Sequence, residues 1–184
     1  MRRGDSDFSS LRLALIGRKS TSAKEQPPRR LSRHFTLRQL IFSETAARRS
    51  IDNTPPARII GNLRILAAGL EQVRELLGHS LHISSAYRCR ALNAAVGGAK
   101  TSHHLRGLAA DFVCENFGTP YRACKKIAAS AIEFDQLIYE CGESAGERWL
   151  HLSFGPKKRR QILTICASMN FRREGLHRWP RARR

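Results

Sequence analysis

The longest regular pattern of apolar positions runs from residue 56 to residue 78. Pro56 suits the first turn of a helix, and Gly78 suits its end. Between them, apolar residues recur at the three- and four-residue spacing of one α-helical face; these are Ile59, Ile60, Leu63, Leu66, Ala67, Leu70, Val73, Leu76 and Leu77. The pattern predicts a long amphipathic helix that belongs to the core and carries no chemistry.

Shorter elements are predicted on both sides of this helix. Before it, Thr36 can cap a short helix that contains Leu37, Leu40 and Ile41. After it, the patterns predict strands at 81–85, 108–114, 137–139 and 149–154 and helices at 91–96 and 121–132, while 162–165 could add one more strand or helix. This order predicts an α+β fold, a single compact domain in which helices pack on one side of a small antiparallel sheet.

The two ends of the chain differ from its centre in charge. Residues 1–33 contain nine Lys or Arg and three acidic residues (+6), and residues 156–184 contain ten and one (+9). Residues 34–155 contain fourteen Lys or Arg and eleven acidic residues, so they contribute only +3 to the formal net charge of +18. We therefore predict a basic disordered segment at 1–33, a folded domain at 34–165 and a basic tail at 166–184.

The charge distribution bears on possible partners. A nearly neutral centre argues against a fold built around a nucleic-acid groove, and the basic ends lack interleaved aromatic residues. Basic tails can still bind polyanions such as nucleic acid, anionic lipid or wall polymers without specificity. No apolar run approaches the ~20 residues of a membrane span. The apolar stretch at 11–16 is too short for a signal peptide, so we expect synthesis in the cytoplasm without a clear export signal.

The cysteines show no paired spacing. The chain has five of them, none in a CxxC pair: Cys89, Cys114, Cys124, Cys141 and Cys166. An odd number without pairs is not typical of a disulfide framework, so reduced thiols are predicted.

The strongest chemical signal is the segment SHHLRGLAAD at 102–111, which fits the pattern S-x-H-x-x-G-x-A-x-D. His104 can offer an imidazole from a loop, Gly107 allows a tight turn, and Asp111 can then direct its carboxylate to the same point. His103 competes with its neighbour, but adjacent residues cannot easily aim at one ion. The spacing therefore favours His104 and Asp111 as two ligands of a metal ion.

A third ligand is expected from the predicted strand at 149–154. His151 lies there, and Trp149 shares its face of the strand, where the indole could form a wall of the site. Two histidines and a carboxylate are a typical ligand set for catalytic zinc, which keeps one position open for water.

Four stretches together resemble the zinc D-alanyl-D-alanine carboxypeptidases and phage murein endopeptidases, a superfamily that includes the Hedgehog signalling domain. They are SSAYR at 84–88, LNAAVGG at 92–98, the motif at 102–112, and DQLIYE at 135–140 with WLH at 149–151. The resemblance covers about residues 34–155. It implies one Zn²⁺ per chain on His104, Asp111 and His151, a catalytic glutamate, and an arginine that contacts the substrate. The implied substrate is the D-amino-acid-containing stem peptide of peptidoglycan, and we expect a monomer that acts on the cell wall.

Further residues carry over from the resemblance. Arg88 matches the family arginine, which can pair with a terminal carboxylate or steady a developing oxyanion; a structural ion pair is the alternative. Ser102 matches a serine beside the substrate, although its hydroxyl could equally bond the backbone of its own loop. Tyr87 and Gln136 are further candidates for substrate contact.

The general base is less clearly specified. Some members of the family place a glutamate three residues before the last histidine, but that position is Arg148 here. Glu140, at the end of the DQLIYE stretch, matches the closer members, and Glu147 is the rival. A damaged site, or an inactive zinc-binding module that recognises the wall, is the alternative to an enzyme. The sequence leaves open whether the enzyme would be a carboxypeptidase or an endopeptidase.

Overall fold

The structure is a computed structural model, and it describes residues 30–142 and 147–178. The disorder predicted for residues 1–29 and the end of the basic tail at 179–184 lie outside the described residues. The helices are α1 (Leu37–Ile41), α2 (Glu44–Arg48), α3 (Ala57–Leu77), α4 (Arg90–Ala95) and α5 (Pro120–Ala128), with short 3₁₀ turns η1 (His103–Arg106), η2 (Glu115–Phe117) and η3 (Ala167–Met169). The strands are β1 (His82–Ser85), β2 (Ala109–Val113), β3 (Gln136–Cys141), β4 (Arg148–Ser153), β5 (Gln161–Cys166) and β6 (Phe171–Glu174).

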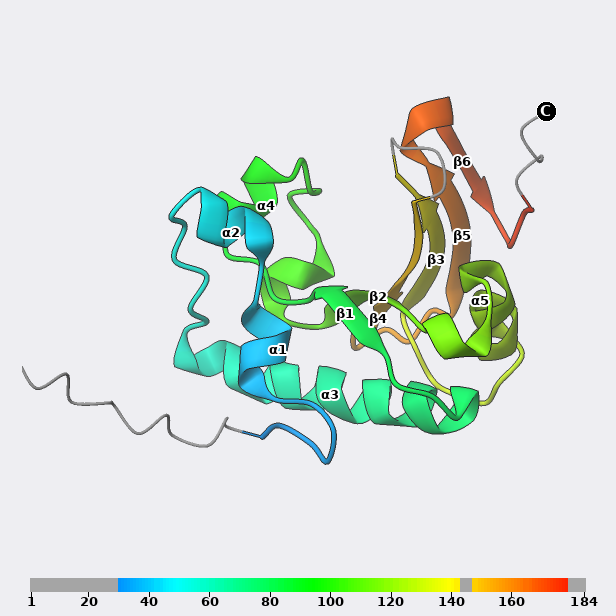
Figure 1. Cartoon of the computed structure of the whole chain (residues 1–184), viewed down its shortest axis with the longest axis horizontal. Coiled ribbons are helices and arrows are strands. Elements are labelled where there is room, and N and C mark those ends of the chain that lie inside the picture. The colour runs from blue at the N-terminus through cyan, green and yellow to red at the C-terminus, as the bar shows by residue number, and fades with distance from the viewer. Residues whose placement is uncertain (1–29, 143–146, 179–184) are drawn as a thin grey trace, which may run out of the picture.

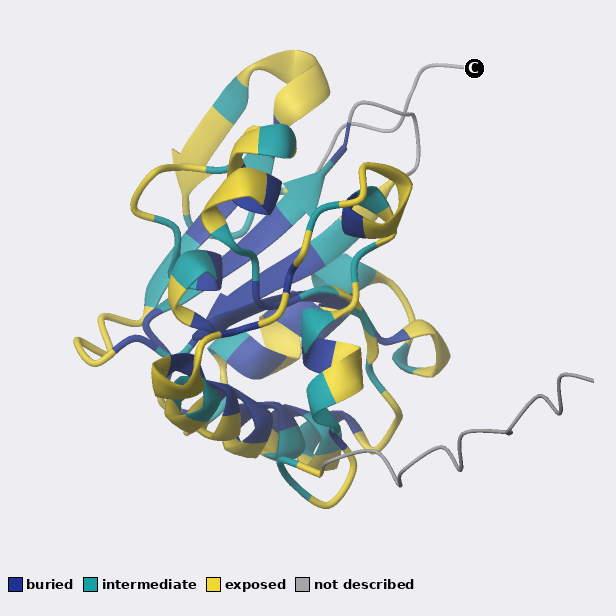
Figure 2. Ribbon diagram, turned by 90° about the vertical axis from the view of Figure 1, so that its left-hand side faces the viewer, coloured by how far each residue is buried: buried dark blue, intermediate teal, exposed yellow. Residues whose placement is uncertain are grey.

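Helix α3 confirms the longest predicted element. Its apolar face is buried in the core, and Gly78 ends it with a left-handed φ of 70°. Figure 1 shows α3 lying along one side of the sheet, and in Figure 2 its dark blue residues face the sheet while its yellow residues face outward. Although α3 is the longest helix described, neither it nor any other helix in the described ranges is apolar enough over sufficient length to cross a membrane.

The approach of α3 to the sheet depends on one glycine. A Cβ atom added at Gly69 would lie 2.3 Å from the ring of Phe154, which directly follows β4. A side chain at this position would therefore force either the Phe154 ring or the helix to shift. The short helix α1 is also confirmed. The Thr36 hydroxyl accepts a hydrogen bond from the backbone amide of Gln39, and the side-chain oxygen of Gln39 accepts one from the backbone amide of Thr36.

The strands form one mixed sheet in the order β1-β2-β4-β3-β5-β6. The α+β class is confirmed, but the sheet is not wholly antiparallel as predicted, because β5 runs parallel to β3. The cause is the path of the chain. After the β3–β4 hairpin the chain is back at the end where β3 begins, and residues 154–160 pass to the far side of β3 before β5 starts. A strand that starts there must run in the same direction as β3.

Several boundaries differ from the sequence predictions. Helix α5 ends at Ala128 rather than at residue 132, and α2 was not expected. The residues at 162–165 belong to strand β5, and β6 pairs with it in antiparallel fashion. The sheet therefore continues beyond residue 165, where the sequence analysis placed the end of the domain.

The prediction of reduced thiols is wrong for one pair of cysteines. Cys141 and Cys166 form a disulfide between the ends of β3 and β5, where the two residues are register partners with Cα atoms 4.7 Å apart. The two are separated by 25 positions in the sequence, so only the parallel register reveals the pairing. Cys89, Cys114 and Cys124 are free thiols, as expected.

Candidate metal centre

The sheet has one face in the core and one face that lines a cleft. On β3 and β4 the core face carries Leu137, Tyr139, Leu150 and Leu152, all buried. The residues between them point the other way. On that second face, the strand register places Asp111 beside His151 and His151 beside Ile138, on β2, β4 and β3. Two of the three predicted ligands are therefore direct neighbours across an antiparallel pair.

The third predicted ligand, His104, comes from the turn that precedes β2. Ser102 caps η1, and its hydroxyl accepts a hydrogen bond from the amide of His104 at 3.3 Å. Gly107 ends the turn with φ 66°, and a Cβ there would lie 2.8 Å from Ile59 of α3. The glycine thus allows both the reversal of the chain and its close packing on α3, which brings His104 back over Asp111.

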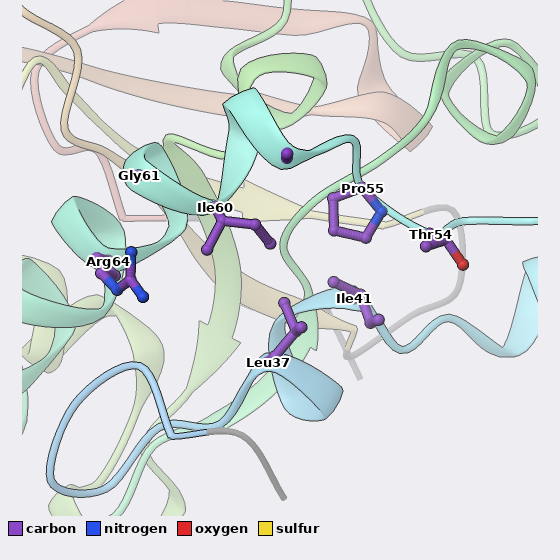
Figure 3. A pocket seen from close by; sticks show the side chains of 8 residues that line it. Leu37, Ile41, Thr54, Pro55, Ile60, Gly61 and Arg64 are labelled. Atoms are coloured by element: carbon purple, nitrogen blue, oxygen red, sulfur yellow. The ribbon is translucent and has the colours of Figure 1, made fainter.

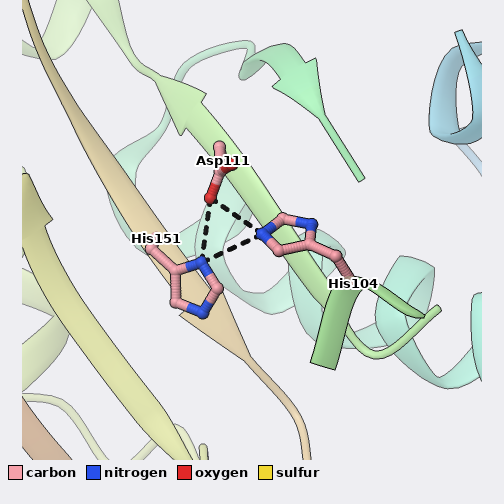
Figure 4. Close-up of side chains that lie close together, drawn as sticks. All are labelled: His104, Asp111 and His151. Carbon is pink, nitrogen blue, oxygen red and sulfur yellow. Dashed lines mark hydrogen bonds and ion pairs between the residues drawn. The ribbon is translucent and has the colours of Figure 1, made fainter. Parts of the chain in front are cut away.

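The three side chains converge on one point (Figure 4). Nε2 of His104 lies 3.1 Å from Oδ1 of Asp111 and 3.1 Å from Nδ1 of His151, and the last two atoms are 2.9 Å apart. Ligands placed tetrahedrally at 2.0–2.1 Å from zinc would be about 3.3 Å apart. All three residues are buried, so the arrangement matches the size of a zinc site closed on three sides.

The hydrogen bonds around His104 show that this cluster is rich in lone pairs. Nδ1 of His104 lies 2.6 Å from the carbonyl oxygen of Ala86, which can only accept, so Nδ1 carries a proton. In the neutral imidazole, Nε2 then presents its lone pair to the oxygen of Asp111. Two lone pairs at this distance repel each other unless a cation or a further proton lies between them. A carbonyl on the outer nitrogen is also the usual means of orienting a histidine toward a metal. The residues therefore fit a bound zinc ion.

Asp111 is held in its ionised form by its surroundings. Burial raises its pKa, but when protons lie between this carboxyl and the two histidines, the charge of His104 and the hydrogen bonds from His104 and His151 hold its pKa well below the usual range. Its second oxygen, Oδ2, accepts a short hydrogen bond from Nη2 of Arg88. Arg88 is in turn oriented by its Nε, which donates to Oγ of Ser85 at 2.8 Å. Arg88 thus fixes one oxygen of Asp111 and leaves the other to the metal position.

A buried asparagine that the sequence analysis did not single out holds the backbone around Arg88. The side-chain amide of Asn53 donates to the carbonyl of Tyr87 at 3.0 Å, and its oxygen accepts from the amide of Cys89 at 2.7 Å. It also donates to the carbonyl of Ile41 at 2.7 Å. The residues on both sides of Arg88 are therefore tied to one side chain. No local pattern in the sequence marks this role, because Asn53 lies in a Pro-rich loop typical of turns.

Glu140 lies beside the metal position. It is on the cleft face of β3, directly opposite Trp149 and two residue pairs along from Ile138 and His151. Burial, together with the nearby charge of Asp111, raises the pKa of Glu140 to about 6. The charges of His151 and Arg88 and a hydrogen bond with Trp149 act in the opposite direction. A carboxylate with this pKa is suited to accept and return a proton near neutral pH.

The other candidate residues are placed differently. Glu147 is exposed in the connection between β3 and β4 and does not line the cleft. The structure does not bring Tyr87 to the cleft either, because its side chain is buried in the core. Gln136 lines the cleft, with its amide donating to Gln161 at 2.8 Å. His103 points away from the metal position, toward Asp135 at 3.5 Å.

The cleft around these residues has a volume of about 880 Å³. It reaches from the loop at 96–104 across β4, β3 and β5 to β6. A smaller pocket of about 480 Å³ lies elsewhere, between α1 and the start of α3 (Figure 3). Its lining is Leu37, Ile41, Thr54, Pro55, Ala57, Ile60, Gly61 and Arg64. This lining offers no carboxylate, imidazole or thiol, so this smaller pocket has no group for metal binding or acid–base chemistry.

Comparison with known proteins agrees with this geometry. The family model described as Peptidase M15 matches residues 33–153. The matched range includes His104, Asp111, His151 and Glu140, and it ends with the last residue of β4. A search of curated proteins found no match.

Proposed function

This chain belongs to the peptidase M15 family, and on that premise we propose that it is a zinc metallopeptidase that hydrolyses the D-amino-acid-containing stem peptides of bacterial peptidoglycan. The observation that carries the proposal is the convergence of His104 Nε2, Asp111 Oδ1 and His151 Nδ1 at one end of a cleft. This set supplies the three protein ligands of a catalytic zinc site, with one ion per chain. When bound, zinc polarises the scissile carbonyl and lowers the pKa of a coordinated water.

Glu140 is our choice for the general base. It lines the cleft beside the metal position, whereas Glu147 lies outside it. In the proposed reaction the carboxylate of Glu140 takes a proton from the attacking water and returns it to the nitrogen of the leaving amine. The raised pKa of Glu140 supports both steps, because the protonated form is accessible at neutral pH.

Arg88 would serve both the site and the substrate. Two of its nitrogens are already engaged, Nη2 by Asp111 and Nε by Ser85, and this fixes the plane of the guanidinium. Nη1 has no hydrogen-bond partner within the described ranges, so it is available to a carboxylate or a developing oxyanion of the substrate. Ser102 and Gln136 line the same cleft and would contact the peptide.

The decisive experiment is digestion of purified peptidoglycan by the zinc-loaded protein, with the released fragments identified by mass. Release of single terminal D-alanine would show a carboxypeptidase, and release of larger peptides would show an endopeptidase. Protein stripped by a chelator is the control and should release neither. If the protein binds zinc but releases no fragment, the result would contradict the peptidase function and favour a zinc-binding module that recognises the wall.

A further inference from the structure

The last two strands of the sheet line the cleft although they lie outside the family match. The match ends at residue 153, whereas β5 begins at Gln161 and β6 ends at Glu174. From this segment the cleft is lined by Gln161, Leu163, Ile165, Ala167 and Arg172. The family match therefore does not include this wall of the cleft.

The strand register places one arginine of this wall in line with the proposed base. Glu140 on β3 pairs with Ile165 on β5, and Ile165 pairs with Arg172 on β6. Paired residues point to the same face of a sheet, so all three face the cleft, as the lining confirms. Two strand spacings separate Glu140 from Arg172, which is about 10 Å. In Figure 1, β6 is the outer strand on this side of the sheet.

Arg172 differs from the other arginines of the cleft in its pairing. Arg88 is engaged by Asp111, and Arg159 makes two hydrogen bonds to Asp135, at 2.9 and 2.7 Å. Arg172 is exposed and forms no ion pair with any residue in the described parts of the chain. An arginine at a cleft wall with a free guanidinium is suited to bind a carboxylate through two parallel hydrogen bonds.

We propose that Arg172 forms a subsite that binds a carboxylate of the substrate peptide away from the scissile bond, so that this chain prefers acidic peptides. The proposal rests on the proposed peptidase function, whose substrate it specifies further. β6 lies three strand spacings from β4, which carries His151, about 14 Å. An extended peptide advances about 3.3–3.6 Å per residue, so the carboxylate should lie about two to four residues from the scissile bond once the reach of the arginine is included.

The test compares two synthetic D-amino-acid-containing peptides that differ only by carboxylate or carboxamide on one residue, placed two, three or four positions from the scissile bond. Wild-type protein, Arg172→Ala and Arg173→Ala are assayed, each loaded with zinc. Arg173 is the matched control, because it is the next residue of β6, points to the opposite face and stacks on Phe171. We expect Arg172→Ala to raise KM for the carboxylate peptide about three- to tenfold with kcat unchanged, and to leave the carboxamide peptide unaffected.

Direct binding of the same peptides, measured by calorimetry, separates this subsite from the proposed catalysis. If the wild-type protein cleaves neither peptide but binds the carboxylate form more tightly through Arg172, the subsite stands and the peptidase function falls. An equal loss of affinity for the carboxylate peptide in Arg172→Ala and Arg173→Ala would indicate an effect of overall charge and would overturn the proposed subsite. So would an unchanged preference in Arg172→Ala, or a wild-type protein that neither cleaves nor binds the peptides.

Discussion

Asp111 and His151 face each other across the antiparallel strands β2 and β4, and 2.9 Å separates Oδ1 of the aspartate from Nδ1 of the histidine. Both strands lie within the sheet, so these two proposed ligands are held by backbone pairing on rigid elements. His104 comes from a turn, but its Nδ1 is fixed by the carbonyl of Ala86. A site preorganised in this way should bind metal without rearrangement of the backbone.

The first prediction concerns the metal ligands. His104→Ala should reduce zinc from about one ion per chain to almost none, because two protein ligands leave an incomplete site. Zinc content would be measured by elemental analysis after dialysis. His103→Ala is the matched control and should keep its zinc, since His103 is directed toward Asp135. Full occupancy in a His104→Ala, His151→Ala double variant would refute the assignment.

The second prediction distinguishes the two glutamates. Glu140→Gln should keep zinc and fold but lose about 10²-fold or more in kcat, because it removes the group that moves the proton. Glu147→Gln should stay within a few-fold of wild type, since this side chain is exposed outside the cleft. Rates on a soluble stem peptide would be compared at equal metal content. The reverse pattern would assign the base to Glu147.

The third prediction concerns the disulfide between Cys141 and Cys166. A double serine variant should lose about 2–4 kcal/mol of unfolding free energy, because the cross-link restricts the unfolded chain. Denaturant titration with and without a reducing agent would measure this. Reduction should destabilise the wild type and leave the double variant unchanged. If reduction leaves the wild-type curve unaltered, the two thiols are not joined in the protein.

The fourth prediction is a pH dependence of stability that depends on Asp135. Hydrogen bonds from Arg159 hold the pKa of this buried carboxyl below its usual value, although burial opposes them. The stability that it contributes is therefore complete above the unfolded pKa of about 3.9 and is lost as the pH falls through the lower folded value. Asp135→Asn should cost about 1–3 kcal/mol near neutral pH, and the difference from wild type should shrink below about pH 4.

Unfolding titrations at several pH values would check this dependence. The control is Glu133→Gln, because Glu133 pairs with Lys158 at 2.6 Å on the exposed surface, where an ion pair contributes at most about 1 kcal/mol. If the difference in unfolding free energy between wild type and Asp135→Asn stays constant down to pH 3, the ion pair of Asp135 with Arg159 does not cause the pH dependence.

The amino-acid sequence by itself determined the local elements and which residues are candidates for the site. Helix α3 follows from the spacing of apolar residues, and its end follows from Gly78, because both signals act within a few residues of the chain. His104 and Asp111 could be chosen as ligands for a similar reason: they lie on either side of a single turn at Gly107, and the pattern of residues around them is specific.

Only the tertiary structure decided which distant residues meet. The parallel register of β3 and β5 brings Cys141 to Cys166 and aligns Glu140 with Ile165 and, through it, with Arg172. Strand pairing between segments far apart in the chain depends on the path of the connections and on which faces are buried, and neither is encoded in a local pattern. For the same reason the sequence favoured Glu140 only through the resemblance and left Glu147 as its rival. The burial that places one in the cleft and leaves the other in solvent is a property of the whole sheet.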